Sequence, residues 1–402
     1  MIRIRLLPIL AALVFGTGAA GAQIPNDTVK IGVLTDASGP FADQSGRGAL
    51  IAAQLAAEDF AKEAPNLKVE VVFGDHQNKA NVGASIVRAW VDREGVTAVT
   101  DTVNSTVGLA VNQIMREKHL TFLATNVGTS DLTGKQCSPV TVQWTMDTWA
   151  FGNAAARAMV KEGGDTWFFI SFDYALGQAL ERDTTEALKK LGARVLGSVK
   201  HPLGTTDFAS YLVAAQASGA KVVALADTGA DLINAVKQAH EFGLTRDQRL
   251  VGLFTQIVDV KAIGLDEAQG LIVTEAFYWD HDDATHAWSR RFAERMGGRM
   301  PTANQAGVYS SVLAYLRAVR KANTVEGEKV VAQMRQAPIQ DPLFGTVTIR
   351  PDGRAVHAMY VFRVKHPGES RGPWDVYTPV ATIPPEEAFR PINQGGCPLV
   401  GG

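Results

Sequence analysis

Residues 29–35 read Val29-Lys30-Ile31-Gly32-Val33-Leu34-Thr35, an apolar and β-branched run that is typical of a buried strand. A helical segment follows, in which small apolar side chains recur with the spacing of one helix face: Ala49, Ala52, Ala53, Ala56, Ala57 and Phe60. That face is almost entirely alanine, so the helix can lie close on a sheet. The pair predicts the first strand and helix of an α/β layer.

The same strand-and-helix unit repeats further along the chain. We predict strands at residues 68–73, 96–101 and 120–125, with helices at 82–92 and 107–118 between them. Such alternation implies a parallel sheet with helices on both faces. The first series therefore predicts one Rossmann-like lobe.

A second series of this kind begins near residue 146. It starts with a helix at 153–161 and contains a helix at 232–242, which Gly243 ends. Its predicted strands lie at residues 167–172, 194–199, 221–226, 250–254 and 270–277. We therefore predict a second Rossmann-like lobe, again a parallel sheet with helices on both faces.

Three helical segments without intervening strands come next, at 284–296, 305–322 and 328–336. A hairpin that turns at Pro351-Asp352-Gly353 follows them. Because three helices do not make a third α/β unit, we expect them to return and cover the first lobe. The predicted domains are lobe one at 23–147 plus 278–355 and lobe two at 148–277 plus 356–402.

The first residues have the features of an export signal. Arg3 and Arg5 precede an apolar run at residues 6–15, and Ala20-Gly21-Ala22 has the small-residue pattern that signal peptidase cleaves after. The alternative is a membrane anchor, but the run is shorter than the roughly 20 residues that a spanning helix needs. No cysteine lies near the cleavage point, so a lipoprotein is not expected. We predict that residues 1–22 are a signal peptide and that the mature chain lies in the periplasm.

The composition is that of a soluble globular protein. The chain has 402 residues, of which 46% are hydrophobic and 20% are charged, and its formal net charge is −2. This charge does not favour nucleic-acid binding. The length exceeds one typical core, which supports two domains. We expect a monomer.

The chain has two cysteines, Cys137 and Cys397. In an oxidising compartment two such thiols are expected to bond to each other, which would attach the tail to the middle of the chain. The alternative is two buried, unpaired thiols.

Ligands of open parallel sheets bind beyond the carboxyl ends of the strands, where helix N-termini point free N–H groups outward. The turns after the first, third and fourth strands are rich in glycine and small polar residues. They supply the candidate ligand-binding residues of lobe one: Ser38, Asn104, Ser105, Asn126 and Gly128. Such residues also cap helices when nothing binds. Taken together, the three turns predict a seat for a carboxylate.

Lobe two presents different side chains at its strand ends. Its candidate ligand-binding residues are Tyr174, Asp227, Thr228, Phe254 and Thr255. They place aromatic rings and one carboxylate opposite the seat in lobe one.

No feature of the chain favours an enzyme. The pair Gly46 and Gly48 lies too far beyond the first strand for a dinucleotide turn, and the third glycine position is Ile51. His281 and His286 do not have the spacing of two metal ligands on one helix face. We therefore predict no catalytic residues, no metal site and no cofactor.

Read together, these residues resemble the periplasmic solute-binding proteins of ABC transporters, in the leucine/isoleucine/valine-binding (branched-chain amino-acid) family. The resemblance rests on the opening strand with Ser38-Gly39-Pro40, on Asn104-Ser105-Thr106, on Asp131-Leu132-Thr133 and on Gly270-Leu271-Ile272-Val273-Thr274. It implies the type I periplasmic-binding fold, in which a three-crossing hinge joins two lobes that close on a solute. A partner permease of the inner membrane then accepts that small-molecule solute.

The resemblance also implies roles for individual residues. Ser105 and the turn at 126–128 would hold a ligand carboxylate, and Tyr174 would close over the ligand. Amino-acid binders of this type place a glutamate near the end of the strand at 250–254, where this chain has Phe254-Thr255-Gln256. Either Asp227 takes over the pairing with a ligand ammonium, or the ligand is an aromatic or aliphatic acid without an amine. The alternative function is a sensory ligand-binding module of the same fold.

Overall fold

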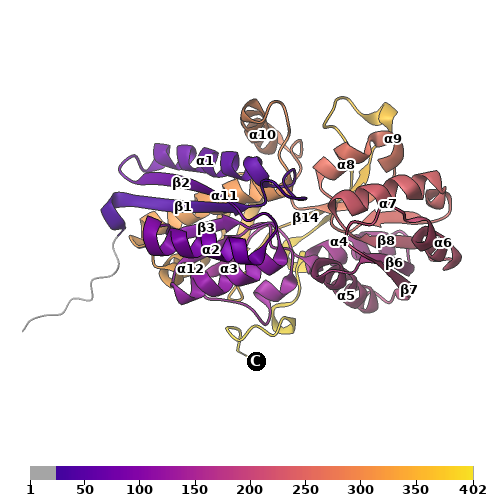
Figure 1. Cartoon of the computed structure of the whole chain (residues 1–402), viewed down its shortest axis with the longest axis horizontal. Helices are drawn as coiled ribbons and strands as arrows, with labels where there is room; N and C mark the ends of the chain where they lie inside the picture. The colour runs from indigo at the N-terminus through magenta and orange to yellow at the C-terminus, as the bar shows by residue number, and fades with distance from the viewer. Residues whose placement is uncertain (1–23, 402) are drawn as a thin grey trace, which may run out of the picture.

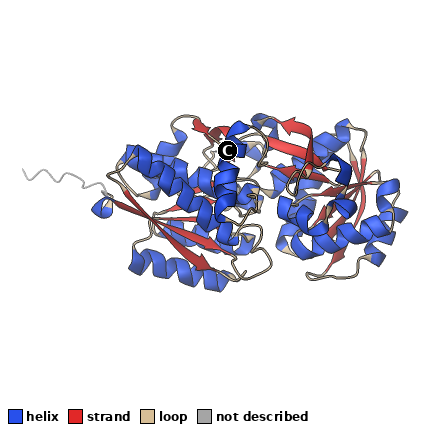
Figure 2. Cartoon of the chain, turned by 90° about the horizontal axis from the view of Figure 1, so that it is seen from above, coloured by secondary structure: helices blue, strands red, loops and turns tan. Residues whose placement is uncertain are grey.

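The computed structural model describes residues 24–401 and contains two lobes (Figure 1). The predicted signal peptide at residues 1–22 lies outside the described residues. In each lobe a sheet lies between layers of helices, as Figure 2 shows. The predicted α/β class is therefore confirmed. Within residues 24–401, no helix has the length and the apolar character needed to cross a membrane.

The first lobe contains a five-stranded parallel sheet with the order β2-β1-β3-β4-β5. Its strands are β1 (Thr28–Thr35), β2 (Lys68–Asp75), β3 (Ala98–Asp101), β4 (Thr121–Ala124) and β5 (Thr141–Gln143). Three helices alternate with them: α1 (Gly46–Glu63), α2 (Ala80–Ala89) and α3 (Ser105–Glu117). The predicted face of α1 is buried at every position except Ala57, which is half-buried, so this helix packs closely as predicted.

The second lobe contains a seven-stranded sheet with the order β15-β14-β10-β9-β8-β6-β7. The predicted parallel strands are β6 (Thr166–Phe172), β7 (Arg194–His201), β8 (Val222–Ala226), β9 (Arg249–Gly252) and β10 (Ile272–Glu275). Two further strands, β14 (Met359–Val364) and β15 (Tyr377–Ile383), extend the sheet in the antiparallel direction. This part of the sheet is thus mixed rather than parallel, which the sequence did not indicate.

Seven helices accompany the second sheet. They are α4 (Thr148–Lys161), α5 (Ala175–Lys190), α6 (Ala209–Ala217), α7 (Gly229–Glu241), α8 (Ile257–Ile263), α9 (Leu265–Ala268) and α13 (Pro385–Ala388). Gly243, just after α7, adopts the left-handed conformation expected of a residue that ends a helix (φ 69°).

The three late helices return to the first lobe, as predicted. They are α10 (Asp283–Arg295), α11 (Ala303–Ala322) and α12 (Gly327–Arg335). Helix α11 packs against α1 and β3, and α12 packs against β4 and β5. Arg291 of α10 and Tyr309 of α11 both bind Asp59 of α1, at 2.8 and 2.9 Å. The predicted hairpin is formed by β12 (Gly345–Ile349) and β13 (Ala355–Val356), and β11 (Ile339–Asp341) pairs with β12.

The chain crosses between the sheets three times, before α4, after β10 and between β13 and β14. Arg354 joins the first and third crossings, because it donates hydrogen bonds to the carbonyl oxygen of Trp144 (2.5 Å) and to Asp147 (3.3 Å). Its side chain is fully buried, and burial lowers the pKa of this guanidinium to about 10. A buried, multiply bonded arginine fixes the two crossings against each other.

The predicted bond between Cys137 and Cys397 is present, with a Cα–Cα distance of 5.6 Å. It attaches the tail to the first lobe, where Arg390 also donates to the carbonyl oxygen of Ser130 at 2.7 Å. The same tail contacts the second lobe, because Asn153 of α4 donates to the carbonyl oxygen of Glu387 at 2.6 Å. The tail therefore contacts both lobes, and the predicted domain boundaries stay a prediction.

Candidate ligand-binding site

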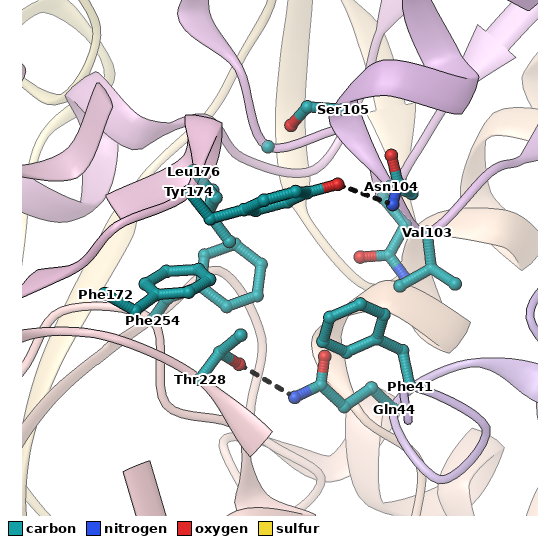
Figure 3. A pocket seen from close by; sticks show the side chains of 12 residues that line it. Phe41, Gln44, Val103, Asn104, Ser105, Phe172, Tyr174, Leu176, Thr228 and Phe254 are labelled. Carbon is teal, nitrogen blue, oxygen red and sulfur yellow. Dashed lines mark hydrogen bonds between the residues drawn. The ribbon is translucent and has the colours of Figure 1, made fainter. Parts of the chain in front are cut away.

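A cleft lies between the two lobes at the carboxyl ends of the strands (Figure 3). The space between the lining residues measures about 370 Å³, including the part that opens to solvent. The residues that line it come from both lobes: Phe41, Gln44, Val103, Asn104, Ser105, Asn126, Gly128, Phe172, Tyr174, Leu176, Thr228 and Phe254. None of these side chains carries a formal charge.

The lobe-one side of the cleft is built around the N-terminus of α3. Asn104 caps this helix, because its Oδ1 accepts hydrogen bonds from the N–H groups of Thr106 (2.7 Å) and Val107 (3.0 Å). Ser105 Oγ accepts a hydrogen bond from Thr129 N–H at 3.1 Å, so its own O–H remains available as a donor. This corner of the cleft can therefore donate hydrogen bonds to an anion, aided by the partial positive charge of the helix end.

Asn126 adds an amide to the same side. Its side chain is 4% exposed, and within the described part of the chain neither amide atom has a hydrogen-bond partner. A buried amide without partners costs free energy, which a bound polar ligand would offset.

The lobe-two side is largely aromatic. Phe172 ends β6, Tyr174 precedes α5 and Phe254 follows β9. Phe254 packs edge-on against Phe151, with ring centroids 4.7 Å apart. The Tyr174 hydroxyl accepts a hydrogen bond from Asn104 Nδ2 at 3.3 Å, across the cleft. These contacts place rigid apolar walls opposite the donor groups of lobe one.

Gln44 makes a second contact between the lobes. Its Nε2 donates to the hydroxyl of Thr228 at 3.0 Å and lies 3.3 and 3.4 Å from the two carboxylate oxygens of Asp259. Asp259 does not line the cleft, and burial raises the pKa of its carboxyl to about 7. The contacts at Tyr174 and Gln44 thus join the lobes across the cleft, and outside the cleft Ser130 Oγ donates to Asp183 Oδ2 of α5 at 2.7 Å.

A family model described as periplasmic binding protein matches residues 28–372. The chain belongs to the periplasmic binding protein family. It is of the branched-chain amino-acid type that the sequence predicted.

Solved relatives cover almost the whole chain. A periplasmic binding protein from Burkholderia mallei is 43% identical, with a TM-score of 0.87 over 93% of this chain and 99% of that chain. A branched-chain amino-acid ABC transporter ligand-binding protein from Burkholderia xenovorans is 38% identical, with a TM-score of 0.87 over 92% and 99%.

A Brucella melitensis protein named Leu/Ile/Val-binding protein homolog 6 is 27% identical over 315 residues, which is 77% of this chain and 78% of that protein. The relatives are solute-binding proteins of ABC transporters rather than enzymes. The family is periplasmic and works with membrane permeases.

The structure brings most of the predicted site residues of this binding protein together. The predicted residues that line the cleft are Asn104, Ser105, Asn126, Gly128, Tyr174, Thr228 and Phe254. Their roles in ligand binding stay a prediction.

Three predicted residues do not line the cleft. Ser38 is exposed, and its hydroxyl donates to Asp75 Oδ2 at 2.5 Å. Thr255 is buried, and its hydroxyl packs against Gly252 at the end of β9, in the space that a side chain at Gly252 would occupy. Asp227 is also buried, and its Oδ2 lies 3.0 Å from Nε2 of His201.

Asp227 is thus occupied inside lobe two of the binding protein. Its Oδ1 also accepts a hydrogen bond from Thr228 N–H at 2.8 Å. Burial alone would lower the pKa of His201, but the contact with Asp227 outweighs burial and raises that pKa. In this structure Asp227 therefore faces His201 rather than the cleft, and its pairing with a ligand ammonium stays a prediction.

Sequence reasoning missed five lining residues, namely Phe41, Gln44, Val103, Phe172 and Leu176. Val103 and Phe172 stand at or just beyond a predicted strand end, so the same rule that found Asn104 could have included them, whereas Phe41 and Leu176 lie further along their turns. Gln44 had no such signal, because it stands nine residues beyond Thr35 and two before α1.

Proposed function

We propose that this binding protein captures a small carboxylic acid that lacks an α-ammonium group and delivers it to an ABC permease of the inner membrane. The body of the ligand is aromatic or aliphatic. One observation carries the proposal: the cleft combines hydrogen-bond donors at a helix N-terminus with aromatic walls, and no lining side chain is charged.

The donor corner of lobe one supports the carboxylate. Ser105 has a free hydroxyl proton, and the amide of Asn126 has no other partner within residues 24–401. Hydrogen bonds to a charged acceptor contribute about 1.5–3 kcal/mol each. Together with the N-terminus of α3 they would hold a carboxylate without an arginine or lysine.

The rest of the lining argues against an α-ammonium. Relatives from Burkholderia xenovorans and Brucella melitensis carry names that refer to branched-chain amino acids. In this chain Asp227 is paired with His201, and Asp259 lies behind Gln44. An ammonium beside the carboxylate seat would be buried without a carboxylate in contact, which is costly.

The contacts between the lobes support capture by closure. Tyr174 reaches Asn104, and Gln44 reaches Thr228, from opposite lobes. A ligand that touches both lobes stabilises this closed form, which the permease would accept. We propose that the protein acts as a monomer and does not bind nucleic acid.

Matched pairs of ligands test the proposal. The mature protein, freed of co-purified ligand by unfolding and refolding, is melted with leucine or 4-methylpentanoate and with phenylalanine or 3-phenylpropanoate. We expect the amine-free member of a pair to raise the melting temperature, since a ligand at a hundred times its Kd adds about 2.7 kcal/mol of stability. Stabilisation by the amino acids alone would refute the proposal, as would no response to either class.

A further inference from the structure

The cleft is polar at two ends and apolar between them. Figure 3 shows Ser105 at one end and the pair Gln44 and Thr228 at the other, with the rings of Phe41, Phe172 and Tyr174 between. The proposed function places the ligand carboxylate at the Ser105 end. It uses the second polar end only as a contact between the lobes and gives it no role in ligand recognition.

The two polar atoms of the Gln44 amide differ, because its nitrogen makes hydrogen bonds and its oxygen makes none within residues 24–401. Its nitrogen donates to Thr228 and faces both oxygens of Asp259. Asp259 Oδ2 also accepts a hydrogen bond from the backbone N–H of Gln256 at 2.8 Å. The nitrogen of the Gln44 amide, rather than its oxygen, faces this carboxyl group and the Thr228 hydroxyl. The orientation of the Gln44 side chain is therefore fixed by lobe two.

The oxygen of Gln44 is the second of these atoms. The residue is 2% exposed, and no residue in the range 24–401 donates a hydrogen bond to its Oε1. Figure 3 shows this oxygen turned toward the space between Phe41 and Thr228. A buried carbonyl oxygen without a donor is costly, and a ligand donor would satisfy it.

We propose that Gln44 is a specificity-determining residue, whose Oε1 accepts a hydrogen bond from a neutral donor, a hydroxyl or amide N–H, at the end of the ligand opposite its carboxylate. This inference rests on the proposed function, because it needs a carboxylate at the Ser105 end. The α-ammonium of an amino acid is adjacent to its carboxylate and would not reach the opposite end.

A neutral donor fits the surroundings better than a distal ammonium. No side chain that lines the cleft is charged. The hydroxyl of Thr228 accepts the Gln44 nitrogen and can donate in turn, so Gln44 and Thr228 together offer one acceptor and one donor. A hydroxyl on the ligand complements both.

Two ligand series test this inference by isothermal titration calorimetry. One is benzoate, 4-hydroxybenzoate and 4-(aminomethyl)benzoate, and the other is hexanoate, 6-hydroxyhexanoate and 6-aminohexanoate. In at least one series we expect the hydroxylated acid to bind roughly tenfold or more tightly than the plain acid, because a site with a buried polar group rejects the analogue that leaves it unpaired. We expect the ammonium member to bind most weakly.

Two variants assign the preference to Gln44. In Gln44→Met the affinities for the hydroxylated acid and the plain acid should become equal to within about twofold. In Gln44→Glu the carboxylate should shift the preference toward the ammonium member, which keeps the inference testable if the Met variant does not fold. Thr228→Val removes the hydroxyl beside Gln44 but leaves Oε1 in place, so it should reduce the preference for the hydroxylated acid without abolishing it.

The outcomes separate the two proposals. If no acid in either series binds, the proposed function is wrong. If the plain acids bind as tightly as the hydroxylated ones, or the ammonium members bind best, the proposed function stands and the role of Gln44 is refuted. Persistence of the hydroxyl preference in Gln44→Met would also refute it.

Discussion

Ser105 combines two properties at the edge of the cleft. Its oxygen accepts a hydrogen bond from Thr129 N–H, which orients the hydroxyl, and its proton remains free to donate to a ligand. The next residue, Thr106, lies in the same turn of α3 and is exposed. These two residues make a matched pair for testing the carboxylate seat.

We expect Ser105→Ala to weaken binding of the preferred acid by about 10- to 100-fold, since a hydrogen bond to a charged group contributes about 1.5–3 kcal/mol and each 1.4 kcal/mol is tenfold. Calorimetric titration measures the change. Thr106→Ala should bind like the wild type. Equal affinities for the two variants would contradict the role of Ser105.

Asp259 predicts how stability depends on pH. Burial raises its pKa from 3.8 to about 7, so between these values the folded state keeps a proton that the unfolded state releases. The contribution is fully present below the unfolded pKa and is lost as pH rises through about 7. Asp259→Asn removes the titration, so its free energy of unfolding should fall less than that of the wild type between pH 5 and 8.

Urea unfolding at pH 5, 6, 7 and 8 measures this difference. Asp266→Asn is the control, because Asp266 is exposed on α9. Parallel pH curves for the wild type and Asp259→Asn would show that Asp259 does not bind the extra proton.

At the scale of single residues, the sequence located those that follow strand ends but not the side chains with which they pair. Asn104, Ser105 and Asn126 could be predicted, because parallel strands bring their carboxyl ends to one edge. Asp227 also follows a strand, yet His201, 26 residues earlier, occupies it inside the lobe. A pairing between separate strands leaves no periodic trace in the sequence.

Helix α4 shows how closely two elements pack in the second lobe. Gly152 faces α5, where an added Cβ would lie 2.1 Å from Thr184 Oγ1 and 2.9 Å from Thr184 Cα. The second atom belongs to the backbone, so the clash cannot be relieved by turning a side chain. The glycine is therefore needed for the approach of the two helices.

We expect Gly152→Ala to lower the free energy of unfolding by about 1–3 kcal/mol, because overpacking outweighs the better helix propensity of alanine. Urea unfolding checks the value. Combining it with Thr184→Ala should restore part of the loss, since the nearer clash is removed. An unchanged or higher midpoint for the single variant would show that the helices can separate without cost.

The elements themselves were predictable where their period was clear. The strand at β1 and the alanine face of α1 follow directly from their spacing. Strands β14 and β15 were not recognised, and the register between them shifts beside Pro379. Strand β14 joins the sheet by pairing with β10, which lies more than 80 residues earlier, so no local pattern specifies it.

At the scale of the whole molecule, the tail links the lobes on the side of the crossings. It is bonded to Cys137 in the first lobe and to Asn153 in the second. The lobes are thus connected by three crossings and by this covalently attached segment.

We expect the double variant Cys137→Ser with Cys397→Ser to lose about 2–4 kcal/mol of stability, because the bond restricts the unfolded chain. Urea unfolding of the oxidised wild type and the variant measures the loss. Wild type unfolded with a reductant should match the variant. A variant as stable as the oxidised protein would show that the noncovalent contacts of the tail suffice.

The disulfide also bears on how the protein is made. Its cysteines are 260 residues apart, so at roughly 5–20 residues per second the thiol of Cys137 is synthesised roughly 10–50 s before its partner. Because the sequence holds two cysteines, a single chain can form one disulfide only, and no internal mispairing has to be reshuffled. The competing product is a bond between two nascent molecules. During oxidation, formation of the bond within one completed chain therefore competes with bonding between two incomplete chains that meet. A high rate of secretion favours the second reaction, which gives crosslinked dimers.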